Sequence, residues 1–283
     1  MRLDLVHDER LTAHDVALWL CRDDLTDPEL PGNKLRKLKY NLLAAREQGH
    51  RTLLTFGGAY SNHLRAVAAA GRRHGFATVG VVRGEPRHPL NPSLAYAAAQ
   101  GMHLVYLDRD LYRQSRTHIP PVLAELCERI GDYYLLPEGG SNALAVRGCA
   151  ELPAEIDIPY DLLCCPVGTG GTLAGLAGGL PPGATALGFA VLRGASFLAD
   201  EVTRLQTETW GAPTANWRLD LDHHFGGYAR TPPDLLAFCT DFTERHGYRP
   251  DPIYTGKMLT GLYARIATGA IPAGTRVVAV TTG

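Results

Sequence analysis

The sequence predicts an α/β protein with mostly parallel strands. Short apolar runs alternate with helical patterns along the 283 residues, which is typical of parallel α/β folding. Several runs, such as 162–165 and 276–280, are apolar throughout, so we expect helices to cover both faces of the sheet. The length suits two closely joined domains better than one.

The individual elements follow from these patterns. Strands are expected at 17–21, 52–56, 78–82, 103–107, 133–136, 162–165, 186–191 and 276–280. Helices are expected at 34–48, 62–74, 92–100, 121–130, 170–178, 197–207, 233–246 and 256–268. We expect the regular strand–helix series at 49–140 to form a smaller domain. Residues 1–48 and 141–283 would then form a larger one.

Composition excludes several classes of function. The formal net charge is −1 with no acidic or basic tail, and no apolar run approaches the length of a membrane span. We therefore expect neither a nucleic acid nor a membrane as a partner. The N-terminus is too charged for a signal peptide. The six cysteines show no C-x-x-C spacing, which favours buried free thiols in the cytoplasm, and no metal site is expected.

The distribution of lysine is informative. Of the 28 basic residues only four are lysine, and three of them, Lys34, Lys37 and Lys39, lie close together. Lysine can lose its proton and act as an amine nucleophile, which arginine cannot do. Lys37 and Lys39 could equally form a solvent-exposed helix face. Lys34 follows Gly32 and Asn33 at the start of an expected helix, where backbone dipoles would lower the pKa of its amine and favour Schiff-base chemistry.

Two glycine-containing loops follow expected strands and precede helices. The loop Gly168-Thr169-Gly170-Gly171-Thr172 would present backbone amides to an anion at a helix N-terminus. It matches neither a Walker loop nor a dinucleotide fingerprint, so a small monophosphate suits it best, although a tight turn is the alternative. In the other loop, amides at Ser61-Asn62-His63 could bind a carboxylate, and Ser61 could transfer a proton. An ordinary helix cap is the alternative there.

These motifs together resemble the family of 1-aminocyclopropane-1-carboxylate (ACC) deaminases and D-cysteine desulfhydrases. The resemblance covers about residues 20 to 283. It rests on six segments that occur in the family's order, at 22–25, 32–38, 57–63, 137–140, 168–172 and 251–257. The family has fold type II of the pyridoxal-phosphate (PLP) enzymes, so the resemblance implies two open, mostly parallel α/β domains with the cofactor in the cleft between them.

The resemblance also implies roles for individual residues. Lys34 would carry PLP as a Schiff base, Asn33 and Asn62 would bond cofactor oxygens, and the loop from Gly168 to Thr172 would hold the phosphate. The substrate carboxylate would lie on Ser61, Asn62 and His63, with Tyr60 in the wall beside the substrate. Tyr254 and, by a looser match, Tyr228 would be active-site tyrosines. The implied partners are a small amino acid and a second copy of the chain in a homodimer.

Position 255 indicates which reaction to expect. ACC deaminases have a glutamate there that keeps the pyridine nitrogen of PLP protonated, whereas Thr255 can only hydrogen-bond it. A weaker electron sink favours β-elimination over ring opening, because elimination discharges the carbanion by expelling a leaving group. We therefore expect a D-cysteine desulfhydrase-like carbon–sulfur lyase. As an alternative, Thr255 could simply cap the helix that begins near Gly256.

Departures from the family pattern leave other reactions open. Cys21 replaces a lysine, Tyr60 stands where glutamine or histidine is common, and the chain ends Thr281-Thr282-Gly283 instead of His-Thr-Gly-Gly. An ACC deaminase, a racemase or a lyase for another sulfur or chlorine analogue such as L-cysteate remain alternatives. A non-catalytic, PLP-free binding protein is the alternative of a different class, against which Lys34 and the glycine loop argue.

Overall fold

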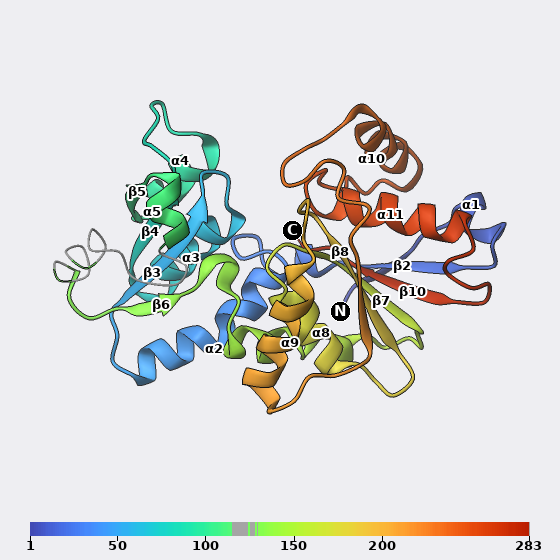
Figure 1. The fold of residues 1–283 in the computed structure, drawn as a ribbon, viewed down its shortest axis with the longest axis horizontal. Helices are drawn as coiled ribbons and strands as arrows, with labels where there is room; N and C mark the ends of the chain where they lie inside the picture. The colour runs from blue at the N-terminus through green and yellow to red at the C-terminus, as the bar shows by residue number, and fades with distance from the viewer. Residues whose placement is uncertain (115–123, 125–127, 129, 283) are drawn as a thin grey trace. The chain divides into compact units, whose positions relative to one another are not determined.

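The chain folds into two compact units, each built around its own β-sheet (Figure 1). The computed structural model describes residues 1–114, 124, 128 and 130–282. One unit combines Met1–Asn33 with Ala143–Gly283, and the other spans Lys34–Asn142. The prediction of an α/β protein with mostly parallel strands is confirmed in both units.

The larger unit contains a six-stranded sheet in the order β1-β2-β10-β7-β8-β9. Strand β1 is antiparallel to β2, and the other neighbouring pairs of this sheet are parallel. The strands are β1 Leu3–Leu5, β2 Ala17–Cys21, β7 Leu162–Val167, β8 Thr185–Ala190, β9 Trp217–Asp220 and β10 Arg276–Val280. The last strand of the chain therefore lies in the middle of the sheet, between β2 and β7.

Successive residues of the central strands face opposite sides of this sheet. In β7, Cys165 and Val167 belong to one apolar cluster and Cys164 to the other, and Val278 and Val277 of β10 divide in the same way. The helices on the first face are α7 Ala143–Cys149, α8 Gly171–Gly179 and α9 Phe197–Trp210. Those on the second are α1 Glu9–Thr12, α10 Pro233–His246 and α11 Thr255–Ala267 (Figure 1). Burial on both faces explains the continuous apolar runs.

The smaller unit contains a four-stranded parallel sheet in the order β5-β4-β3-β6. Its strands are β3 Thr52–Gly58, β4 Ala77–Arg83, β5 His103–Leu107 and β6 Tyr134–Leu136. Its helices are α2 Asn33–Glu47, α3 Asn62–His74, α4 Pro92–Ala99 and α5 Arg109–Gln114. Helix α3 packs closely on the sheet, because a side chain at Gly57 would collide with Leu64 and one at Gly80 would crowd it.

The predicted elements agree with the structure where the hydrophobic pattern is long. The strands predicted at 17–21, 103–107 and 276–280 and the helices at 62–74 and 233–246 have the predicted bounds, and the other described ones shift by one to three residues. The helix predicted at 121–130 lies mostly outside the described residues. Elements of three to seven residues were missed because they are too short to show a period, namely β1, α1, α5, α7, β9 and the 3₁₀ turns η1 Asp23–Leu25, η2 Glu138–Gly140 and η3 Leu152–Glu155.

The units divide at residues 33/34 and 142/143, whereas the sequence suggested 48/49 and 140/141. Helix α2 therefore groups with the smaller unit. Its side chains explain why: Asn41 donates to the Asn142 side chain at 3.1 Å and accepts from the Tyr134 hydroxyl at 3.0 Å. These bonds join the helix to β6 and to the loop that follows it.

Some negative findings apply to the described residues. In that part of the chain, no helix is long and apolar enough to cross a membrane. Within the same residues, no group of three or more His, Cys, Asp or Glu side chains could hold a metal ion. The described cysteines are all buried: Cys21, Cys149, Cys164, Cys165 and Cys239.

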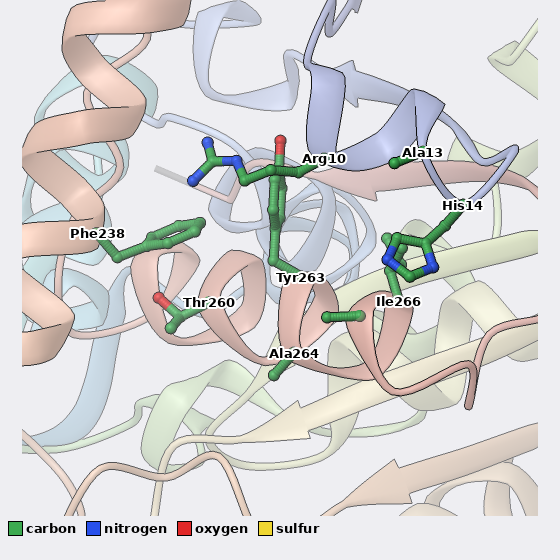
Figure 2. A pocket seen from close by; sticks show the side chains of 9 residues that line it. Arg10, Ala13, His14, Phe238, Thr260, Tyr263, Ala264 and Ile266 are labelled. Atoms are coloured by element: carbon green, nitrogen blue, oxygen red, sulfur yellow. The ribbon is translucent and has the colours of Figure 1, made fainter.

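A buried carboxylate joins the N-terminal segment of the larger unit to α10 and α11. Asp8 accepts from Arg10 at 2.6 Å, from the Tyr263 hydroxyl at 3.1 Å and bonds His246 Nε2 at 3.1 Å. Burial alone would raise the pKa of Asp8, but the bonds from Arg10 and Tyr263 outweigh burial and hold the pKa well below its ordinary value. Beside this cluster, a pocket of about 500 Å³ extends over α11, with Arg10 stacked on Tyr263 and Phe238 reaching in from α10 (Figure 2).

Replacing this carboxylate should destabilise the larger unit. We predict that Asp8→Asn lowers the free energy of unfolding by about 2–3 kcal/mol, because it removes a buried charge bonded to three partners. Urea denaturation measures the change. Glu9→Gln is the control, since the Glu9 side chain is 83% exposed and lies 3.6 Å from Arg245, so the loss should be about 0.5 kcal/mol or less. Equal losses in both variants would contradict the importance of the cluster.

Candidate active site

In the larger unit, the predicted glycine loop and the C-terminal segment follow adjacent parallel strands. Strand β7 leads into the glycine loop and β10 leads into Thr281 and Thr282. Since parallel strands end at the same edge of a sheet, both segments lie at the carboxyl edge. This edge is where ligands bind in open α/β sheets.

The glycine loop ends in an uncapped helix N-terminus. Gly170 is the N-cap of α8 with φ +80° and makes no side-chain cap bond. The first amides of a helix have no acceptor within the helix, and here no cap side chain serves them. The Thr172 hydroxyl accepts from Asn33 Nδ2 at 2.8 Å, and both side chains are buried. Backbone amides, two hydroxyls and a helix dipole suit a phosphate, so the residues present fit the predicted anion.

Gly32 brings Asn33 to this loop through a close backbone contact. Its φ is +60°, and a Cβ atom there would lie 2.3 Å from the Thr282 carbonyl oxygen. Only glycine tolerates both constraints. Steric exclusion therefore explains why the first residue of Gly32-Asn33-Lys34 is glycine. Lys34 follows Asn33 directly in the chain.

The predicted tyrosines Tyr254 and Tyr228 lie at the same edge. A side chain at Gly168 would approach the Tyr254 ring at 3.5 Å, so the ring lies against the glycine loop. The rings of Tyr254 and Tyr228 meet edge to face at 6.0 Å, and Tyr228 is 39% exposed. The structure thus brings together Asn33, the glycine loop and both tyrosines, although Tyr228 was only loosely matched in the sequence.

Thr255 does not cap α11, which rules out that alternative. The cap comes from Asp251, whose carboxylate accepts from the amides of Ile253, Tyr254 and Thr255 at 2.8–3.0 Å. The Thr255 side chain is buried, and it partly offsets the rise that burial causes in the pKa of Tyr248. A hydroxyl has one proton and two lone pairs, so Thr255 can offer a ring nitrogen a neutral hydrogen bond. Sequence reasoning overlooked Asp251, although an Asp side chain commonly bonds the backbone amides that closely follow it.

In the smaller unit, the two motif loops also follow adjacent parallel strands. Strand β3 leads to the segment 57–63, and its neighbour β6 leads to 137–142. Ser61 is the N-cap of α3 and accepts from the Leu64 amide at 3.3 Å. The capping alternative is thus present, and it leaves the Ser61 hydroxyl proton available to a second group. Tyr60 is 65% exposed and Asn62 is exposed.

The His63 side chain is enclosed instead of presented to solvent. It is 2% exposed and its Nε2 lies 2.9 Å from the Thr55 hydroxyl. A side chain at Gly140 would fall 2.7 Å from the ring, which explains glycine at that motif position. Burial lowers the pKa of His63 well below its ordinary value, and the charges of Lys34 and Lys37 add to this. The His63 ring is therefore not available to a carboxylate. The backbone amide of His63, in the first turn of α3, is the group that could bind one.

The three clustered lysines differ in their surroundings. Lys34 is half-buried in the first turn of α2, and Lys39 is exposed beside the Tyr40 ring. Lys37 is buried and donates to the Gly139 carbonyl oxygen at 2.9 Å and to Ser141 Oγ at 3.0 Å. Lys37 is therefore not part of a solvent-exposed face. The rarity of lysine in the chain was the signal that could have identified it.

Comparisons with known proteins agree with this geometry. A family model described as pyridoxal-phosphate dependent enzyme matches residues 3–283. A putative ACC deaminase of Thermotoga maritima is 30% identical over 259 residues, covering 87% of this chain and 82% of the relative. A D-cysteine desulfhydrase of Klebsiella pneumoniae is 30% identical over 268 residues, covering 87% and 80%. A solved ACC deaminase homologue has a TM-score of 0.88 at 24% identity and covers 100% of this chain and 88% of its own.

The burial of His63 predicts a pH dependence of stability. The folded protein keeps the imidazole neutral, whereas the unfolded chain binds a proton below about pH 6.5. The free energy of unfolding should therefore fall as the pH drops below about 6.5, by up to about 1.4 kcal/mol per pH unit from this group. Urea denaturation between pH 7.5 and 5 should show a smaller slope in His63→Gln. Asn62→Ala, an exposed neighbour, should keep the parent slope; an unchanged slope in His63→Gln would contradict the prediction.

Proposed function

Because the chain belongs to the family of pyridoxal-phosphate dependent enzymes, we propose that it is a carbon–sulfur lyase that converts D-cysteine and water to pyruvate, ammonia and sulfide. It is a PLP-dependent lyase of fold type II, and D-cysteine is the part we propose. One observation carries the assignment of the site. Asn33, which bonds Thr172 at the uncapped start of α8, directly precedes the half-buried Lys34.

The chain's own residues would hold the cofactor at several of its chemical groups. Lys34 would bind its aldehyde, and Gly168, Thr169, Gly170, Gly171 and Thr172 would bind its phosphate through backbone amides and hydroxyls. Asn33 and Asn62 would bond its oxygens, and Thr255 its ring nitrogen. When bound, PLP supplies an electron sink conjugated to the amino nitrogen of the substrate.

Other residues would position the substrate and move protons. The amides of Asn62 and His63 begin α3, where the helix dipole favours a carboxylate. The Ser61 hydroxyl, which already accepts from Leu64, keeps a proton to donate. Tyr254 and Tyr228 would protonate the departing sulfur. Tyr60, being exposed, would contribute to the wall beside the substrate.

The choice of elimination over ring opening rests on Thr255. A carboxylate at this position would keep the ring nitrogen protonated, whereas a hydroxyl offers only a neutral hydrogen bond. Expelling sulfide requires less stabilisation of the carbanion than opening a cyclopropane. ACC deamination remains the second candidate, because the relative of Thermotoga maritima carries that name at 30% identity. The cytoplasmic location and the homodimer stay predictions.

Lys34 provides the test of cofactor binding. We predict that Lys34→Ala loses the visible absorption of the bound cofactor, because no side-chain amine remains at position 34 to bind the cofactor's aldehyde. For the same reason, turnover should fall by about 1000-fold or more. Lys39→Ala is a matched control, an exposed lysine on the same helix, and should keep both. Absorption spectra and pyruvate release measure the effects. A parent protein that shows no visible band when incubated with PLP would instead favour a PLP-free binding protein.

A substrate comparison tests the reaction. We predict that D-cysteine gives pyruvate and sulfide in equal amounts, and that its kcat/KM exceeds that of ACC by about tenfold or more. L-cysteine and L-cysteate should be poorer substrates. Pyruvate, 2-oxobutanoate and sulfide are measured separately, so ring opening and elimination give different products. Release of 2-oxobutanoate from ACC at the higher kcat/KM would establish the second candidate instead.

A further inference from the structure

Lys257 is fully buried in the first turn of α11, and its ammonium contacts three backbone carbonyl groups. Nζ donates to the carbonyl oxygens of Gly227 at 2.6 Å, His224 at 3.0 Å and Val191 at 3.4 Å. An ammonium has three N–H donors, so three carbonyl groups satisfy it. The contact joins α11 to the residue after β8 and to the turn at 224–227.

Carbonyl dipoles are the principal compensation for this charge. Asp251 is the carboxylate whose charge favours the ammonium, but its oxygens accept the amides of Ile253, Tyr254 and Thr255. Burial lowers the pKa of Lys257, and the Asp251 charge opposes that effect. A cation surrounded by carbonyl oxygens is also how proteins hold K⁺.

The turn that Lys257 contacts has an unfavourable backbone conformation. Within the turn, Phe225, Gly226 and Gly227 have φ values of +51°, +86° and +112°, and Ala229 just after it has +56°. Positive φ costs energy at the two residues that are not glycine, so surrounding contacts must maintain the conformation. The carbonyl groups of His224 and Gly227 are the ones held by the ammonium.

Tyr228 is adjacent to this turn. It follows Gly227 directly, is 39% exposed, and its ring lies 6.0 Å from that of Tyr254. The phenol of Tyr228 is therefore oriented by a turn whose backbone is bonded to Lys257.

We propose that the Lys257 ammonium is a built-in monovalent cation and that Lys257 is a positioning residue, which holds the turn at 224–227 and so orients Tyr228. The role of Tyr228 in turnover rests on the proposed function, whereas the cation role does not. Arginine could not replace it, because a planar guanidinium cannot direct donors at three converging carbonyl groups as an ammonium does.

Hydrogen exchange tests the cation role without cofactor or substrate. In Lys257→Ala, the amides of residues 226–230 should exchange about tenfold or more faster than in the parent, because the turn opens more often. Ammonium or potassium chloride should restore slow exchange by entering the vacated site, and choline chloride at the same ionic strength should not. Equal exchange in parent and variant, or equal effects of the three salts, would overturn the proposal.

A second variant covers the case in which Lys257→Ala does not fold. Lys257→Met fills the same space with an apolar chain, so it should lose protection at 226–230 and gain none from any salt. Unchanged protection would overturn the proposal. Lys39→Ala, which removes an exposed lysine, should exchange like the parent.

Turnover distinguishes this proposal from the proposed function. With PLP bound, Lys257→Ala should keep the visible absorption, lose about tenfold or more in kcat with D-cysteine, and regain it in ammonium chloride. A parent protein without D-cysteine turnover, whose turn nevertheless responds to Lys257→Ala and to ammonium as expected, would contradict the proposed function and support the cation role.

Discussion

The strands that precede the motif loops run parallel within each sheet, so the loops after them gather at one edge. In the larger unit this places the glycine loop next to the end of β10, and in the smaller unit it places the segment 57–63 next to 137–142. Two glycines show how closely the segments approach. Gly32 leaves no room for a side chain beside the Thr282 carbonyl, and Gly140 leaves none beside His63. The geometry of the motif loops within each unit follows from this packing.

Backbone groups and side chains have different tasks in this protein. Amides at the starts of α8 and α3 are the groups suited to anions, since helix N-termini attract negative charge without a charged side chain. Charged side chains mostly position the backbone. Asp251 accepts three successive amides before α11, and this cap orders the helix start that carries Tyr254 and Lys257.

The scarcity of lysine has a physical explanation. Lys37 and Lys257 are both buried, and each donates to backbone carbonyl oxygens from a compact ammonium. Arginine has a planar fork of donors that suits carboxylates better than several converging carbonyl groups. Lys34 is in turn the residue assigned to the amine chemistry, which arginine cannot perform. Three of the four lysines thus occupy positions where arginine would not serve.

The family, the cofactor and the α/β class could be predicted from the sequence, because motifs and long hydrophobic periods depend on local order along the chain. The candidate residues at the glycine loop and at the start of α3 were identified in the same way. Tertiary structure decided how side chains are used. The burial of His63 and Thr255 and the carbonyl partners of Lys37 and Lys257 depend on enclosure or join residues that are distant in sequence. No local pattern encodes such contacts, since burial and pairing arise only when separate segments pack together.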